Sequence, residues 1–136
     1  MRVRYAETDQ MGVVYHSNFF VWFEVGRVEL LRELGFAYKE MEEQDDCHIV
    51  VAEVQCAYKK PARYDDVVRI RTRVTEARTR TIRFSYEASN DATGELLATG
   101  ETFHVICDSS GRPKLLPEKY RIHLPLSDNA VQSTKP

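Results

Sequence analysis

Apolar residues alternate with polar ones over the middle and later parts of the chain. Residues 67–75 carry valine and isoleucine at alternate positions with arginines between them, and residues 79–88 alternate in the same way. This period predicts strands with one buried side, which is typical of an antiparallel sheet with one wet face. We expect further strands over 48–58 and 95–107, and a hairpin turn at 90–94. In 48–58 the residues expected on one face are Val50, Ala52, Val54, Cys56 and Tyr58.

A helical pattern precedes these strands. Residues 18–34 form a predicted helix whose first part, 19–23, is apolar on all sides, so we expect it to be buried on most of them. Ser17 or Asn18 would cap its start through a side-chain oxygen. Gly35 would end it, because glycine takes the left-handed conformation without strain. Shorter elements are expected as a strand at 1–7 and as helical turns at 37–44 and 117–120.

One apolar helix followed by long strands predicts a fold of the α+β class. A mostly apolar helix needs a wall on several sides, and an antiparallel sheet curled around one long central helix would supply it. The pattern alone also allows other α+β layouts. The domain would span residues 1–126, and residues 127–136 read as a polar C-terminal tail.

Composition narrows the class of protein. The chain has 136 residues, of which 43% are hydrophobic, enough for a single packed core. Nineteen basic against 21 acidic residues argue against a dedicated nucleic-acid binder. We expect neither a membrane span nor a signal peptide, because no apolar run is long enough. Three scattered cysteines do not form a disulfide framework, so a reducing, cytoplasmic location fits best.

The segment before the helix carries the candidate chemistry. Asp9 is followed by Gly12, which permits a tight turn, and then by the helix start. Unpaired N–H groups at a helix start form a positive, hydrogen-bond-donating site. A carboxylate near such donors suits attack on a polarised carbonyl. The alternative is that Asp9 only stabilises its own turn, and composition alone favours that alternative.

The full string around Asp9 resembles a known family. Asp9 and Gly12 are followed by Val13-Val14-Tyr15-His16 and then by Phe19-Phe20. This ordered set closely resembles the acyl-CoA thioesterases of the 4-hydroxybenzoyl-CoA thioesterase type in the hotdog superfamily, in particular the short bacterial enzymes associated with the Tol–Pal system. Met11 departs from the pattern, since relatives often carry a smaller residue there. Further matches are Phe23-Glu24-Val25-Gly26-Arg27, Leu30-Leu31, Tyr58, Pro61-Ala62, Asp65-Asp66 and Gly111-Arg112-Pro113.

The resemblance implies the hotdog fold and the hydrolysis of acyl-CoA thioesters to free acid and CoA. In that family the aspartate is the nucleophile or the general base for water, which falls on Asp9. The thioester carbonyl is polarised by a backbone N–H at the helix start, which falls on His16. The imidazole of His16 either assists in binding or proton transfer, or contributes nothing beyond its backbone. No cofactor is implied, and the other histidines lack metal-ligand spacing.

Further residues are candidates for substrate binding. The resemblance places Gly12, Tyr15 and Glu24 near the substrate. The alternative for Glu24 is an ion pair with Arg27, one helical turn on. Coenzyme A carries phosphates, so basic side chains should line the entrance. The candidates are Lys59, Lys60 and Arg63 in one connection, whereas the strand arginines are better explained as a solvated face paired with glutamates.

Assembly and alternative functions follow from the same features. A sheet wrapped on one helix leaves open edges, which are normally paired or covered, so we expect a homodimer or a homotetramer. An acyl-carrier-protein thioesterase would use the same chemistry on another carrier. A non-catalytic acyl-binding module is the alternative from another class. A hotdog dehydratase is disfavoured, because its histidine and acid are placed differently from Asp9.

Overall fold

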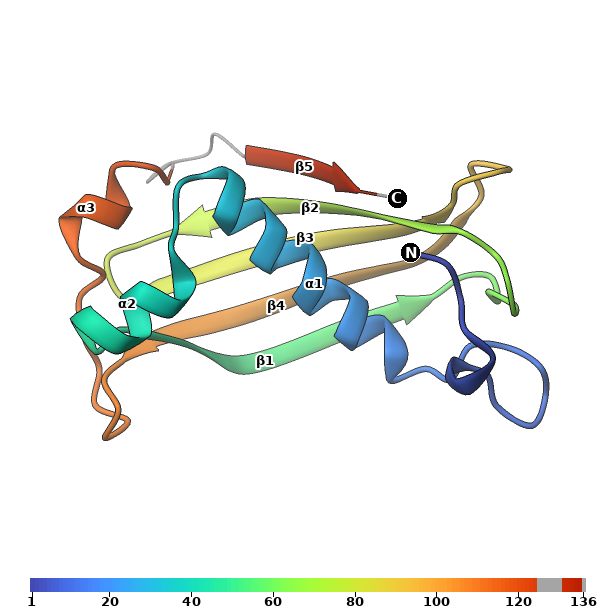
Figure 1. The fold of residues 1–136 in the computed structure, drawn as a ribbon, viewed down its shortest axis with the longest axis horizontal. Coiled ribbons are helices and arrows are strands. Elements are labelled where there is room, and N and C mark those ends of the chain that lie inside the picture. Colours follow the sequence, from blue (N-terminus) through green and yellow to red (C-terminus); the bar gives the residue numbers. More distant parts are fainter. Residues whose placement is uncertain (125–130, 136) are drawn as a thin grey trace.

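The protein folds into a sheet with helices on one face. The computed structural model describes residues 1–124 and the backbone of residues 131–135. The strands are β1 (His48–Tyr58), β2 (Val68–Ala77), β3 (Thr81–Asn90), β4 (Leu96–Cys107) and β5 (Val131–Lys135). The helices are a 3-10 turn, η1 (Tyr5–Glu7), and α1 (Asn18–Glu33), α2 (Tyr38–Asp45) and α3 (Glu118–Arg121). The sheet is antiparallel in the order β1-β4-β3-β2-β5, and α1 lies across it (Figure 1). The predicted α+β class is confirmed.

Three strands follow the alternation seen in the sequence. In β2 and β3 the apolar positions are buried and the arginines between them face solvent, as predicted. The faces of β4 could not be assigned from the sequence, and here Ala98, Thr102 and Ile106 point inward with the buried residues of β3. The hairpin turn at 90–94 is also confirmed, because the Gly94 N–H donates to the Asn90 carbonyl at 2.7 Å.

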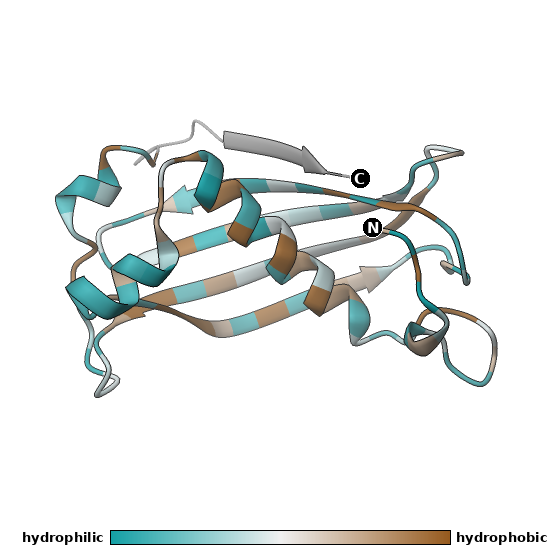
Figure 2. Cartoon of the chain, in the orientation of Figure 1, coloured by the Kyte–Doolittle hydropathy of each residue, from teal (hydrophilic) through white to brown (hydrophobic). Residues whose placement is uncertain are grey.

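Helix α1 supplies the apolar layer that covers the sheet. It begins at Asn18, and Gly35 follows its end with φ of 92°, the left-handed conformation expected there. The Phe23 ring is completely buried and stacks on Tyr86 with centroids 4.4 Å apart. Figure 2 shows hydrophobic positions along α1 and in the strands beneath it. The burial expected on most sides of the helix start is confirmed, because Phe19, Trp22 and Phe23 are buried, while Val21 remains 53% exposed.

The predicted side-chain cap of α1 is wrong. Ser17 has helical backbone angles, and its hydroxyl accepts no hydrogen bond from the first turn of α1. The Asn18 side chain instead donates its amide N–H to the carbonyl of Glu7 at 2.9 Å. Asn18 therefore ties α1 to the preceding segment rather than to its own turn.

The strand expected at 1–7 is present only in its first residues. Val3 donates to the Asp66 carbonyl at 2.8 Å, and Val68 donates to the Met1 carbonyl at 2.7 Å. The chain then leaves the sheet and forms η1. The turn is stabilised by Glu7, whose Oε1 accepts the Arg4 N–H at 2.8 Å.

Strand β1 departs from the single apolar face predicted for it. Its register with β4 shifts between Val51 and Glu53, so the alternation is interrupted by a bulge. Val50 lies opposite Val105, whereas Val54 lies opposite Thr102, which places the two valines on opposite faces. Residues 50–55 are all exposed.

The C-terminal stretch is described only in part. Of the tail expected at 127–136, residues 127–130 and 136 lie outside the described residues, as do residues 125 and 126 of the expected domain. Residues Val131–Lys135 form β5, which pairs antiparallel with β2. That part of the expected tail is a strand of the sheet.

Candidate active site

The loop between η1 and α1 is a small closed hairpin. Asp9 donates its N–H to the Val13 carbonyl at 2.8 Å, and Tyr15 donates to the Glu7 carbonyl at 2.9 Å. Gly12 closes the turn with φ of 80°, a conformation that favours glycine. Asp9 and the start of α1 thus belong to one hydrogen-bonded unit at one end of the molecule (Figure 1).

The two oxygens of the Asp9 carboxylate have different surroundings. Oδ1 accepts hydrogen bonds from the N–H groups of Met11 at 2.8 Å and Val13 at 3.4 Å. Oδ2 has no hydrogen-bond partner among residues 1–124, and the side chain is half-buried. The turn role considered for Asp9 therefore occupies one oxygen and leaves the other available for chemistry.

The start of α1 presents unused backbone donors. The N–H groups of His16 and Ser17 form no hydrogen bond within the described part of the chain, although those of Tyr15 and Asn18 do. Such groups carry the positive end of the helix dipole. The His16 imidazole is exposed and lies against the Tyr15 ring, with centroids 4.3 Å apart. It forms no hydrogen bond with Asp9.

Tyr58 connects the end of β1 to this helix start. Its hydroxyl donates to the His16 carbonyl at 2.9 Å. Burial, reinforced by the neighbouring Cys56 thiol, raises the pKa of Tyr58 to about 12, so the phenol remains a donor at neutral pH. The sequence offered Tyr58 as a strand residue and as a family match, and the contact with His16 was not predicted.

The basic connection after β1 lies beside the Asp9 loop. The Val14 N–H donates to the Ala62 carbonyl at 2.8 Å, and Val13 and Arg63 form an isolated antiparallel β-bridge. The charged groups of Lys59, Lys60 and Arg63 are exposed and form no ion pair with any described residue.

Two of the strand arginines, Arg69 and Arg71, differ from this connection, because they have acidic partners. Arg69 contacts Asp91 at 2.8 Å, and Arg71 lies 3.8 Å from Glu87. This agrees with the solvated, paired face expected for them, although the partner of Arg69 is the aspartate Asp91 rather than a glutamate.

The remaining candidates lie at the surface. Tyr15 is half exposed beside His16, and a side chain at Gly12 would meet no atom within 4 Å. Glu24 is exposed on α1. The ion pair between Glu24 and Arg27 considered as its alternative role is not formed among the described residues.

Glu7 is a residue that sequence reasoning missed. Its carboxylate is buried and accepts the Trp22 indole N–H at 3.0 Å, so it joins the Asp9 loop to α1. The one signal in the sequence was the position of Glu7, two residues before Asp9. The contact with Trp22, 15 residues away, could not be inferred from spacing.

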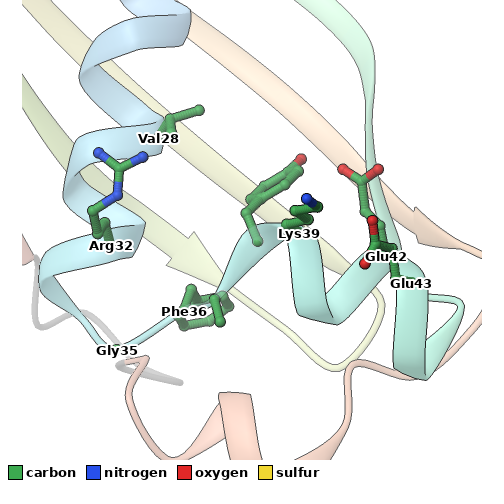
Figure 3. A pocket seen from close by; sticks show the side chains of 9 residues that line it. Val28, Arg32, Gly35, Phe36, Lys39, Glu42 and Glu43 are labelled. Atoms are coloured by element: carbon green, nitrogen blue, oxygen red, sulfur yellow. The ribbon is translucent and has the colours of Figure 1, made fainter.

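A separate cavity lies at the other end of α1. It has a volume of about 690 Å³ and is lined by Val28, Arg32, Phe36 and charged residues of α2 (Figure 3). The end of α1 and helix α2, which line it, lie at the opposite end of the molecule from the Asp9 loop in Figure 1, so the cavity is not part of the candidate site. Among the described residues, no three His, Cys, Asp or Glu side chains are grouped to hold a metal ion, and no helix is long and apolar enough to cross a bilayer.

The fold is an antiparallel sheet covered by one main helix. At the helix start, a carboxylate oxygen and two backbone N–H groups have no hydrogen-bond partner among the described residues. These features are those of a candidate hydrolase of the α+β class. Residues 3–124 match the thioesterase-like superfamily, and the chain belongs to that family. The solved structures similar to it include thioesterases with the hotdog fold.

Individual relatives are similar over most of the chain. The putative acyl-CoA thioesterase YneP of Bacillus subtilis is 36% identical over 135 residues, covering 99% of this chain and 94% of the relative. The acyl-CoA thioester hydrolase YbgC of Escherichia coli is 33% identical over 119 residues, with 87% of each chain covered. The DHNA-CoA thioesterase of Staphylococcus aureus superposes with a TM-score of 0.81 at 37% identity, covering 85% of this chain and 77% of that one.

Proposed function

We propose that this protein hydrolyses acyl-CoA thioesters to the free carboxylic acid and CoA. Asp9 acts as nucleophile or general base, and the His16 N–H polarises the thioester carbonyl. One observation carries the proposal. The same loop holds an Asp9 carboxylate oxygen and a His16 N–H, and neither group has a hydrogen-bond partner among the described residues.

The protein is a thioesterase. The chain belongs to the thioesterase-like superfamily over most of its length, and its named relatives are acyl-CoA thioesterases and thioester hydrolases. The finer assignment to the Tol–Pal-associated branch is our proposal and rests on the Asp9 to His16 motif. So is the picture of α1 as the single central helix around which the sheet curls.

The chemistry follows from the two groups. Attack on the thioester carbon, by Asp9 Oδ2 or by a water that Oδ2 deprotonates, places negative charge on the carbonyl oxygen. The His16 N–H, aided by the helix dipole, stabilises that charge. Loss of the CoA thiolate then gives the acid directly, or an acyl-Asp9 anhydride that water hydrolyses.

Substrate contacts are proposed on both sides of the loop. Lys59, Lys60 and Arg63 would bind the phosphates of CoA, because they are exposed, adjacent to the loop and not engaged by carboxylates among the described residues. Gly12 and Tyr15 would lie at the entrance, and Glu24 would orient substrate or water. A reducing, cytoplasmic location remains our proposal, supported by three cysteines that are free thiols.

Two other functions stay open. An acyl-carrier-protein thioesterase would use the same loop, with the basic connection meeting an acidic carrier instead of CoA phosphates. A non-catalytic acyl-binding module would bind the thioester without cleaving it.

Thiol release distinguishes these functions. We expect release of CoA from short or medium acyl-CoA, because the helix start is apolar and aromatic. The measurement is a panel of short, long and aromatic acyl-CoA esters, with the matching acyl-carrier-protein esters beside them. Cleavage of the carrier esters alone would favour the acyl-carrier-protein thioesterase. Binding of every ester without thiol release would establish the non-catalytic acyl-binding module.

The open edge of β1 is the proposed assembly surface. Beyond β4, β1 has no neighbouring strand among the described residues, and its residues 50–55 are exposed on both faces. A long exposed edge is normally covered or paired, so we propose that two copies join along β1, as a homodimer or as half of a homotetramer.

Light scattering at micromolar concentration should therefore give at least the mass of a dimer. Val54→Lys places a charge on the exposed edge strand and should shift the mass toward the monomer. The matched control is Ile122→Lys, which changes an exposed apolar residue beside α3, away from β1. An active monomer in the unmodified protein would contradict the proposed assembly.

A further inference from the structure

The Glu7 carboxylate is buried where the Asp9 loop meets α1. It is 7% exposed and is the only Asp or Glu among the buried residues that the structure describes. Oε1 accepts the Arg4 N–H at 2.8 Å and has the Arg4 guanidinium at 3.4 Å. Oε2 accepts the indole N–H of Trp22 at 3.0 Å. Both oxygens are therefore used, as a buried charge requires.

The backbone of Glu7 holds the same junction. Its carbonyl accepts the Tyr15 N–H and the Asn18 side-chain N–H, each at 2.9 Å. One residue thus contacts the segment before Asp9, the residue before His16, and two successive turns of α1.

The charge on Glu7 is maintained by its partners. Burial alone would raise the pKa of the Glu7 carboxyl, but the hydrogen bonds from the Arg4 N–H and from Trp22 outweigh it and lower the pKa. The group is therefore a carboxylate at neutral pH, and it can accept both N–H donors at once. A neutral amide in its place would direct an N–H group at one of them.

We propose that Glu7 is a positioning residue of the thioester-hydrolysis site. Its carboxylate fixes the Asp9 loop against α1 through Trp22, and so sets the position of the Asp9 oxygen relative to the His16 N–H. Glu7 does not contact the substrate. The inference rests on the proposed function and adds the residue that holds its two catalytic groups in place.

The expected effect is on turnover rather than on binding. Glu7→Gln should lower kcat about 10-fold to 100-fold, because small displacements of reacting groups have effects of that size. KM should change less than about twofold, since the groups proposed to bind CoA are untouched. Trp22→Phe removes only the N–H donor, so kcat should fall in the same direction.

A double-mutant cycle identifies the contact. If Glu7 and Trp22 act through one hydrogen bond, the double variant should be no slower than the slower single variant. The matched control is Tyr120→Phe, which removes a 2.6 Å hydrogen bond to Asp45 at the far end of the molecule (Figure 1). It should leave kcat within about twofold, although it also removes a partly buried bond to a carboxylate.

Amide hydrogen exchange gives a readout that needs no activity. Glu7→Gln should increase exchange in residues 8–17 while β3 stays protected, and Tyr120→Phe should not. Unchanged exchange in 8–17, a kcat within twofold of the unmodified protein, or an equal loss in Tyr120→Phe would each overturn the proposal. If the unmodified protein cleaves no thioester, the proposed function fails, while the exchange result still decides whether Glu7 holds the loop.

Discussion

Replacing Asp9 by Asn should lower kcat/KM for acyl-CoA hydrolysis by at least about 100-fold, because it removes the nucleophile or general base. The fold should persist. The Asn oxygen can still accept the Met11 N–H, which Asp9 Oδ1 accepts at 2.8 Å, and the amide nitrogen takes the place of Oδ2, which has no hydrogen-bond partner among residues 1–124. Activity is measured by thiol release, and the fold by circular dichroism and chemical denaturation.

The His16→Ala variant is the informative comparison. Its backbone N–H survives the change, and the imidazole forms no hydrogen bond among the described residues, so it should lose less activity than Asp9→Ala. A folded Asp9→Asn enzyme that keeps more than half its turnover would show that Asp9 is not the catalytic carboxylate. A His16→Ala enzyme as inactive as Asp9→Ala would instead assign proton transfer to the imidazole.

The regular strands could be predicted because their signal is local. The alternation in β2 and β3 places Ile70 and Phe84 inside and Arg71 outside. Because one face of each strand is buried, the alternation alone specifies which residues face the core. In β1 the bulge between Val51 and Glu53 depends on pairing with β4, so the period alone put Val50 on the same face as Val54, whereas Val50 lies on the opposite face.

The predictions for the N-terminal elements were wrong for a related reason. The strand expected at 1–7 and the cap expected at Ser17 were local interpretations of local patterns. In the structure Glu7 and Asn18 use their side chains across the junction between the segment and the helix. Such contacts join residues 11 and 15 positions apart, which no capping or alternation rule covers.

The candidate site divides in the same way. Asp9, Gly12 and His16 form a contiguous motif, so a family resemblance in the sequence is enough to name them. The Tyr58 hydroxyl reaches the His16 carbonyl across 42 residues, and the basic connection meets the loop through the bridge between Val13 and Arg63. These neighbours depend on the fold and could not be placed from spacing.

The largest loss of stability is expected for Phe23→Ala. The Phe23 ring is completely buried and stacks on Tyr86 at an interplanar angle of 11°. Removing a buried phenylalanine ring typically costs about 3–5 kcal/mol, because a cavity remains where the structure cannot relax. Relaxation is restricted here, since Gly100 beneath the ring has no side chain that could move into the space.

Gly100 makes this prediction testable as a pair. A Cβ at Gly100 would lie 2.4 Å from Phe23 Cε2 and 2.9 Å from the Gln55 carbonyl oxygen, so Gly100→Ala should destabilise the unmodified protein. In the Phe23→Ala background only the backbone contact remains, and the same substitution should cost less. The two changes should therefore be non-additive, as expected for residues in contact.

Free energies of unfolding are compared at one fixed protein concentration, because assembly contributes to apparent stability. Phe20→Ala, a half-buried ring on the same helix, should lose less than Phe23→Ala. Equal losses at both positions, or strict additivity with Gly100→Ala, would show that the Phe23 ring does not fill the space above Gly100.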